Sequence, residues 1–301
     1  MGDQLQPEKD HEEILPGIEF IKMFNMIARK MKFNHYLLSI LAVMLSLIAC
    51  SEVYAMTSDT IPDKIPEGEA IPADSAILLG QFSNGLTYYI LENKKPENRA
   101  QLWLVVNAGS VLEDEDQLGL AHFTEHMAFN GTKNFAKHEI INYLESIGIK
   151  FGPEINAFTG FDETVYMLQL PTDSAEVIEK GFQILADWAQ HVSFEPEEID
   201  KERGVIIEEW RLGRGADMRM LDKQLPGILK DSRYGERLPI GKVEVIENFD
   251  HQSLKRFYSD WYRPDLMAVI AVGDFEAGGI RDLLGNYFEK IPGKAAPRGR
   301  K

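Results

Sequence analysis

The sequence is poor in cysteine and in positive charge. It has one cysteine, Cys50, and 32 basic against 48 acidic residues, for a formal charge of −16. One thiol excludes a disulfide framework and any zinc site built from cysteine ligands. The negative charge argues against nucleic acid and anionic membrane surfaces as partners, and we interpret it as a solubility feature. What remains is an ordinary globular composition, enough for one large domain or two small ones over 301 residues.

The chain also lacks an apolar run long enough to span a bilayer comfortably. The run over residues 36–49 follows a cluster of basic residues and is only about 14 residues long, which is typical of an export signal. Leu47-Ile48-Ala49-Cys50 resembles the lipobox of bacterial lipoproteins, which implies that Cys50 is lipidated and anchors an exported protein to a membrane. The alternative is an ordinary signal peptide cleaved after Ala55. The position of the single thiol favours the lipobox, and hence the periplasm or the cell surface.

Beyond a polar, proline-containing tether over residues 51–74, hydrophobic periodicity predicts alternating blocks of strands and helices. Turn residues Asn84-Gly85 predict a hairpin, and the nearly continuous apolar segment 101–107 predicts a central strand. The expected strands cover 77–82, 86–91, 101–107, 154–159, 164–170 and 266–272, and the expected helices cover 118–129, 137–147, 174–190, 195–210, 253–262 and 280–288. This order predicts an α+β fold with layered helices on one mixed or antiparallel sheet.

Four consecutive acidic residues, Glu113, Asp114, Glu115 and Asp116, lie in the loop before the expected helix over 118–129. A run of like charges in a loop is usually a solvated surface. We therefore expect these residues to be exposed and to take no part in a functional site.

The segment His122-Phe123-Thr124-Glu125-His126 places three side chains of metal and proton chemistry within five residues. On a helix, His122 and His126 are four residues apart and lie on the same face, which Glu125 shares. Two neutral imidazoles with a carboxylate beside them provide two zinc ligands and a base for a water molecule. The pattern therefore predicts a hydrolytic zinc site on this helix.

A third ligand has to come from another element, leaving one position open for water. The expected helix over 195–210 carries three candidate carboxylates, Glu202, Glu208 and Glu209. Glu202 and Glu209 are seven residues apart, or two turns, and share a face. Glu208 points about 100° away from Glu209 and is less suited to the same task.

The five-residue motif is the inverted zinc motif H-x-x-E-H, and the sequence resembles the pitrilysin/insulinase family of zinc metallopeptidases, the inverzincins. The resemblance covers roughly residues 75–295. It continues beyond the motif through residues 126–133, 156–159, 202–209, 262–264 and 272–275. These segments match the end of the zinc helix, an Asn-Ala-aromatic-Thr strand, the helix of the third ligand and the second half of the family's repeated unit.

The resemblance implies one Zn²⁺ ion bound by His122, His126 and Glu209. If the segment 202–209 is aligned differently with the family's third-ligand helix, Glu208 replaces Glu209 as the implied ligand. Glu202 corresponds to an acid that orients the site from behind the ligands.

The resemblance also implies how peptides are bound and cleaved. Glu125 is the implied general base, which accepts a proton from a water molecule held by the metal. The strand of Asn156, Ala157, Phe158 and Thr159 is the implied edge onto which peptide substrates add as an extra strand. The implied activity is that of a zinc-dependent endopeptidase acting on peptides or small unfolded proteins.

Peptidases of this family contain repeated αβ units, and a later unit supplies an Arg and a Tyr that help to hold the substrate. We find one unit in this sequence, so we expect a second homologous αβ unit in a longer chain or on a partner chain, and weak or no activity from this unit alone. The expected organisation is an N-terminal extension with the signal and lipobox (1–50), the tether (51–74), the zinc peptidase part (75–225), the second part of the same αβ unit (226–295) and the start of a linker (296–301).

Two other functions stay open. Some members of the family keep the fold without the chemistry, so the chain could be a non-catalytic structural or binding subunit of a peptidase-like complex. A zinc-storing lipoprotein is the third possibility, for which Glu125 would be superfluous. The presence of all three ligands and the base favours the enzyme.

Overall fold

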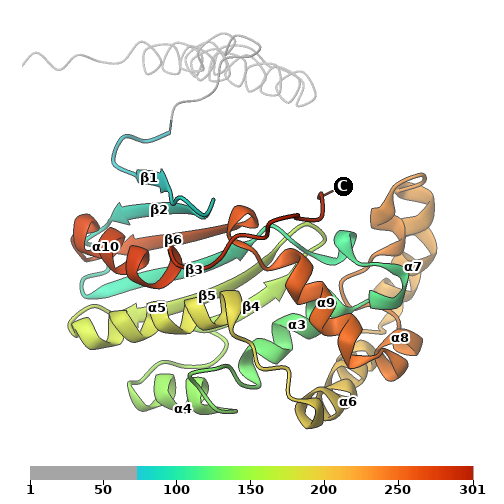
Figure 1. The fold of residues 1–301 in the computed structure, drawn as a ribbon. Helices are drawn as coiled ribbons and strands as arrows, with labels where there is room; N and C mark the ends of the chain where they lie inside the picture. Colours follow the sequence, from blue (N-terminus) through green and yellow to red (C-terminus); the bar gives the residue numbers. More distant parts are fainter. Residues whose placement is uncertain (1–72, 301) are drawn as a thin grey trace, which may run out of the picture. The chain divides into compact units, whose positions relative to one another are not determined.

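A computed structural model describes residues 73–300, which form one six-stranded sheet with helices packed against it (Figure 1). The signal segment, Cys50 and nearly all of the expected tether lie outside the described residues. Within residues 73–300, no helix has the length and apolar character needed to cross a membrane. The strands are β1 (Leu78–Gln81), β2 (Thr87–Glu92), β3 (Arg99–Val106), β4 (Ile155–Thr159), β5 (Thr164–Pro171) and β6 (Met267–Gly273).

The strand order is β1-β2-β6-β3-β5-β4, and β2 and β6 form the one parallel pair in this sheet. β1 and β2 form the predicted hairpin, in which Gly85 adopts a φ of 95° that favours glycine. β3 lies between β6 and β5, which confirms the predicted central strand. The predicted α+β class, with helices layered on one mixed sheet, is confirmed, and β6 enters the sheet centre from late in the chain.

The helices in residues 73–300 are α3 (Leu120–Phe129), α4 (Glu139–Ser146), α5 (Ala175–Gln190), α6 (Pro196–Leu212), α7 (Ala216–Ile228), α8 (Val243–Asn248), α9 (His251–Trp261) and α10 (Ala277–Phe288). Six of these helices correspond to the six ranges expected from the sequence, and α7 and α8 lie outside those ranges. α6 begins with Pro196, Glu197 and Glu198, because proline and acids are favoured in the first turn of a helix. α3 and α6, the two helices that matter most for function, lie beside each other.

One face of the sheet is covered by helices and forms the core. Side chains of a strand alternate between the two faces, and on β3 Leu102 and Leu104 are fully buried. Tyr166 of β5 lies opposite Leu104. Its ring stacks on Trp188 of α5 at 5.1 Å and lies 6.5 Å from the ring of Phe129 of α3. Both helices therefore pack on this face.

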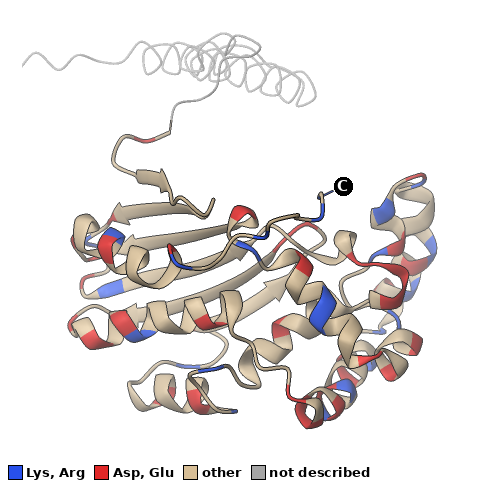
Figure 2. Ribbon diagram, in the orientation of Figure 1, with Lys and Arg blue, Asp and Glu red and all other residues tan. Residues whose placement is uncertain are grey.

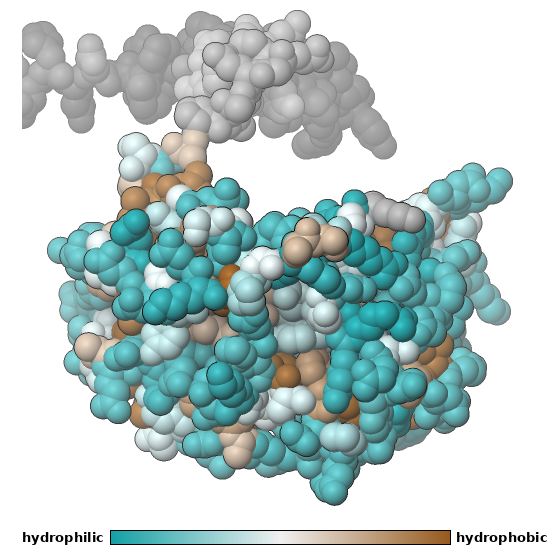
Figure 3. Space-filling model, viewed as in Figure 1, coloured by the Kyte–Doolittle hydropathy of each residue, from teal (hydrophilic) through white to brown (hydrophobic). Residues whose placement is uncertain are grey.

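The opposite face of the sheet carries a row of apolar side chains that are only partly buried. Tyr89 of β2, Ile270 of β6, Trp103 of β3 and Met167 of β5 are consecutive partners across the four strands. Tyr89 is 39% exposed, and the other three are partly exposed. We call these four residues the open sheet face. Most of the surface seen in Figure 3 is hydrophilic, and apolar residues also reach the surface around β1, where Leu79 is 50% exposed.

The expectation that residues 113–116 are exposed is confirmed for Glu115 and Asp116, wrong for Glu113, and only partly met by Asp114. Glu113 is fully buried, and each of the other three acids pairs with a base that is distant in the sequence. The pairs are Asp114 with Arg298, Glu115 with Arg237 and Asp116 with Arg256. Such partners cannot be inferred from a local run of charge. We call residues 113–116 the acidic turn; the remaining acids are spread over several helices (Figure 2).

Candidate metal centre

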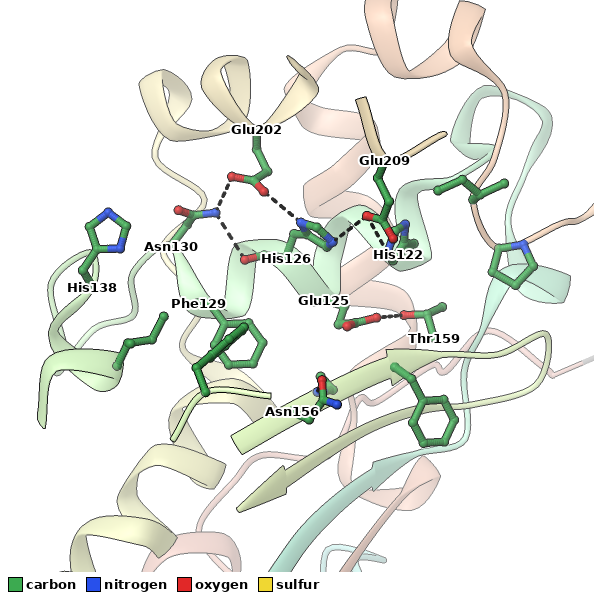
Figure 4. A pocket seen from close by; sticks show the side chains of 16 residues that line it. His122, Glu125, His126, Phe129, Asn130, His138, Asn156, Thr159, Glu202 and Glu209 are labelled. Atoms are coloured by element: carbon green, nitrogen blue, oxygen red, sulfur yellow. Dashed lines mark hydrogen bonds and ion pairs between the residues drawn. The ribbon is translucent and has the colours of Figure 1, made fainter. Parts of the chain in front are cut away.

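α3 presents His122, Glu125 and His126 to a cleft, as their spacing predicts (Figure 4). The helix is held from its other side by Phe123 and Met127, which are almost completely buried. The two imidazole rings are neighbours on successive turns, with centroids 4.7 Å apart. Packing of the apolar side thus fixes the direction in which the polar side points.

α6 brings Glu209 to the histidine pair. Its Oε2 lies 3.7 Å from Nε2 of His122 and 3.5 Å from Nε2 of His126. Atoms bound tetrahedrally to Zn²⁺ at about 2.0–2.1 Å are about 3.3 Å apart, so both distances are close to the spacing that one ion requires. The three candidate ligand atoms all lie within 4.8 Å of one another. The Glu209 side chain is 51% exposed, which leaves the cleft side of this group open. The donor set therefore fits a zinc site with three protein ligands and one open position.

Glu202 holds the other nitrogen of His126. The Nδ1–H of His126 donates to Oε1 of Glu202 at 2.8 Å, and Nδ2 of Asn130 donates to Oε2 at 2.8 Å. Because a carboxylate can only accept, Nδ1 carries the proton and Nε2 keeps its lone pair for a metal. Glu202 therefore fixes both the tautomer and the orientation of this ring.

The two histidines differ in their electrostatic surroundings. Burial lowers the pKa of His122 to about 3, and the neighbouring His126 lowers it as well, so this ring is neutral at physiological pH. Its Nδ1 is buried and has no hydrogen-bond partner among residues 73–300. Burial also lowers the pKa of His126, but the hydrogen bond and charge of Glu202, together with the charges of Glu125 and Glu209, outweigh burial and raise the pKa above its usual value.

Glu125 lies between the metal ligands and strand β4. Its side chain is almost fully buried, and the Oγ1 hydroxyl of Thr159 donates to its Oε2 at 2.6 Å (Figure 4). Burial raises the pKa of Glu125, and the bond from Thr159 lowers it. A carboxyl whose pKa is moved toward neutrality is suited to accept and return a proton.

β4 forms the edge of the sheet beside α3. At one end of β4, the N–H of Gln169 donates to the carbonyl of Glu154. At the other end, the N–H of Gly160 donates to the carbonyl of Glu163. Because bonding alternates along an antiparallel strand, the N–H and C=O of Ala157 are directed away from β5. The Ala157 N–H donates to Oδ1 of Asn156 at 2.9 Å. This part of β4 can therefore accept another strand.

The structure brings His122, His126, Glu209, Glu125 and Glu202 together with the predicted strand over 156–159. It places the alternative residue Glu208 elsewhere, paired with Arg211 on the exposed side of α6. Sequence reasoning did not single out the contact of Asn130 with Glu202 or that of Thr159 with Glu125. The cleft is also lined by residues that carried no signal of their own, including His138, Ile141, Phe151, Pro239 and Ile240.

Comparison with known proteins agrees with this geometry. The family described as Insulinase (Peptidase family M16) matches residues 88–225, and the Peptidase M16 inactive domain matches residues 248–301. The chain belongs to this insulinase/pitrilysin family of zinc metallopeptidases. Zinc proteases of the family use one zinc ion.

Individual relatives extend the match to most of the described fold. The chain is 41% identical over 239 residues to the "Probable zinc protease PqqL" of Haemophilus influenzae, covering 79% of this chain and 25% of that protein. The crystal structure of the first half of the periplasmic protease PqqL from Escherichia coli matches with a TM-score of 0.74 and 37% identity, over 77% of this chain and 50% of that chain. Pitrilysin matches with a TM-score of 0.65 and 21% identity, over 80% of this chain and 25% of that chain, which shows a shared fold. The chain spans about a quarter of the length of the curated relatives it matches.

Proposed function

We propose that this chain is the zinc-binding unit of an endopeptidase that hydrolyses peptide bonds in peptides or small unfolded proteins. The observation that carries the proposal is the convergence of Glu209 on His122 and His126, with the buried carboxyl of Glu125 beside them. Three ligands alone would suffice to store zinc. The additional carboxyl, held at the cleft by a hydroxyl, is what a hydrolytic site requires.

In this proposal His122, His126 and Glu209 hold the ion. A zinc ion bound in this way polarises a substrate carbonyl and makes a water molecule more acidic. Glu125 accepts a proton from the attacking water and delivers it to the leaving amine. Thr159 binds one oxygen of Glu125 and leaves the other oxygen free for the proton.

The substrate is proposed to bind as an additional strand along β4. The outward N–H and C=O of Ala157 would pair with the peptide backbone, and this mode reads the backbone rather than particular side chains. Asn156 gives up its bond to the Ala157 N–H when a peptide takes that position. Strand addition requires an extended segment, which explains why unfolded chains are the proposed substrates.

A second homologous αβ unit is proposed to complete the enzyme, in the same full-length chain or on a partner. The first half of the E. coli periplasmic protease is twice as long as the part matched here, which is consistent with such a unit. The open sheet face offers it a place, because Tyr89, Ile270, Trp103 and Met167 form an apolar row that is partly exposed to solvent. Without the second unit, we expect weak or no peptidase activity from this chain.

A non-catalytic binding subunit is the alternative. Such a subunit does not need the base, and it does not need the ligands to converge. The cleft of this chain contains Glu125 and its Thr159 partner as well as the three candidate ligands, which favours the enzyme. The two functions differ in whether peptide cleavage depends on Glu125.

We further propose that the protein is exported and lipidated at Cys50, which lies outside the described residues. Support comes from the basic and apolar signal segment and from the periplasmic relative in E. coli. Cells grown with labelled palmitate test this directly. The label is expected in the wild-type protein and absent from Cys50→Ser; a labelled Cys50→Ser protein, or an unlabelled wild type, would refute lipidation at this site.

The activity is tested with purified wild-type chain, Glu125→Gln and the matched control Glu208→Gln, which changes an exposed carboxylate that faces away from the cleft. We expect one zinc ion per chain in all three. We expect slow cleavage of an unstructured fluorogenic peptide by wild type and Glu208→Gln, and no cleavage by Glu125→Gln. Equal cleavage by Glu125→Gln would refute the mechanism. Because this unit alone can be inactive, zinc binding without cleavage favours the non-catalytic alternative only if a longer chain that includes the second unit is inactive as well.

A further inference from the structure

The first turn of α3 has no cap from its own sequence. The residue before the helix is Gly119, at a φ of 100°, and it has no side chain to offer. The first four N–H groups of a helix lack partners within the helix, and the N–H of His122 is one of them. A buried helix end of this kind needs hydrogen-bond acceptors from elsewhere in the chain.

Glu113 of the acidic turn supplies acceptors for two of these N–H groups, those of Gly119 and Ala121. Its Oε2 accepts the N–H of Gly119 at 3.0 Å, and its Oε1 accepts the N–H of Ala121 at 2.8 Å. The side chain is fully buried, so water does not compete for these two bonds.

The backbone of the acidic turn is itself fixed. The carbonyl oxygen of Glu113 accepts hydrogen bonds from the guanidinium groups of Arg233 and Arg237, and Arg237 is 4% exposed. The loop that begins with these arginines continues to Pro239 and Ile240, which line the cleft. Glu113 thus connects the start of α3 with a wall of the proposed substrate site.

This connection matters for His122 in particular. The ring of His126 is oriented by Glu202, whereas Nδ1 of His122 has no hydrogen-bond partner within residues 73–300. Its Nε2 faces Oε2 of Glu209 at 3.7 Å, which is longer than a hydrogen bond. The position of the His122 ring therefore depends on the backbone of His122, which lies in the first turn of α3. This is the turn to which Glu113 is hydrogen-bonded.

We propose that Glu113 is a positioning residue of the metal centre, which fixes the first turn of α3 and through it the place of His122. The inference rests on the proposed zinc site and adds a residue that touches neither the ligands nor the substrate strand. It assigns to Glu113 a role in building the site, in place of the solvated position expected from its sequence.

The test compares zinc affinity, by competition with a chromophoric chelator, in wild type, Glu113→Gln, Glu113→Ala and a control, Asn84→Ala. Asn84 lies in the β1–β2 turn and donates to the carbonyls of Phe288 and Ile291, at the sheet edge opposite β4. Loss of the Asn84 amide removes partly buried hydrogen bonds without touching α3. Amide hydrogen exchange at Gly119 and Ala121 is measured in the same proteins, so that the first turn is followed independently of zinc.

We expect zinc affinity to fall by several-fold in Glu113→Gln, which keeps one acceptor oxygen, and by roughly tenfold or more in Glu113→Ala. Amide exchange at Ala121 should be faster in Glu113→Gln than in wild type and fastest in Glu113→Ala. Asn84→Ala should match wild type in zinc affinity and in amide exchange. If Glu113→Ala does not fold, Glu113→Gln decides the question. Unchanged affinity in the Glu113 variants, or an equal fall in Asn84→Ala, would refute the positioning role. Wild-type protein that binds no zinc would instead refute the proposed function.

Discussion

The hydroxyl of Thr159 donates a 2.6 Å hydrogen bond to Oε2 of Glu125, and this bond joins the edge strand β4 to the zinc-motif helix α3. The same strand is the proposed site of substrate addition. A peptide that pairs with β4 therefore lies on the strand whose Thr159 is hydrogen-bonded to the proposed base, Glu125.

Removal of this hydroxyl is expected to slow catalysis. Thr159→Val deletes a bond to an acidic group worth about 1.5 kcal/mol, so kcat should fall by roughly tenfold. Thr159→Ser keeps the hydroxyl and should retain most of the activity. Steady-state kinetics with zinc content measured in parallel checks the prediction. A large loss of zinc in Thr159→Val would show that the bond supports the metal site rather than the base.

Glu202 is expected to govern zinc affinity through His126. Glu202→Gln removes the negative charge beside Nδ1 of His126, and substitutions of this kind lower metal affinity by about 10–100-fold. Glu208→Gln is the matched control on the same helix, because Glu208 pairs with Arg211 on the exposed side. Chelator competition measures both variants. Equal affinity in the two would rule out the orienting role of Glu202.

The substrate strand can be tested at one backbone group. Ala157→Pro removes the outward N–H of β4, so KM for an unstructured peptide should rise by about tenfold while zinc content stays at one ion per chain. Ala157→Ser keeps the N–H and is close in size. Steady-state kinetics with an unstructured peptide compare the KM values of the two variants. A KM in Ala157→Pro equal to that of Ala157→Ser would mean that peptides do not pair with β4 at this position.

Glu113 is expected to make stability depend on pH. Burial raises the pKa of Glu113 to about 8, against an unfolded value near 4.5, even though the bonds from Ala121 and Gly119 lower it. Between these values the folded state binds the proton more tightly, so this contribution to stability is present below about pH 4.5 and is lost as the pH rises through about 8.

The measurement is urea unfolding of wild type and Glu113→Gln from pH 5 to pH 9. The free energy of unfolding of wild type should fall more steeply with pH, and the difference between the two curves should change by an amount on the order of a few kcal/mol. Parallel curves would show that Glu113 has the same pKa in both states.

The sequence predicted the part of the site that depends on local geometry. The four-residue spacing of His122 and His126 and the seven-residue spacing of Glu202 and Glu209 each define one helix face, and both pairs face the cleft. Turn residues predicted the hairpin, a continuous apolar run predicted the central strand β3, and helical periodicity predicted the helices other than α7 and α8. These features follow from short-range patterns, which a single sequence displays.

The contacts that join distant segments were not predictable in this way. Nothing near Glu113 in the sequence shows that Arg233 and Arg237 fold over it, and four adjacent acids are most often solvated. One signal was present: the segment before α3 has Gly119 where a capping Ser, Thr, Asp or Asn is usual. A helix that carries metal ligands and lacks a local cap indicates that an acceptor comes from another element.

The open sheet face also provides an optical reporter. Of the four tryptophans, Trp188 and Trp261 are buried, whereas Trp103 stands in the apolar row on the sheet face away from the helices. A partner unit that covers this face would move the Trp103 indole into a drier environment and shift its fluorescence to shorter wavelength. Assembly could therefore be followed in real time by intrinsic emission, with Trp103→Phe as the silent control and without any label attached to the protein.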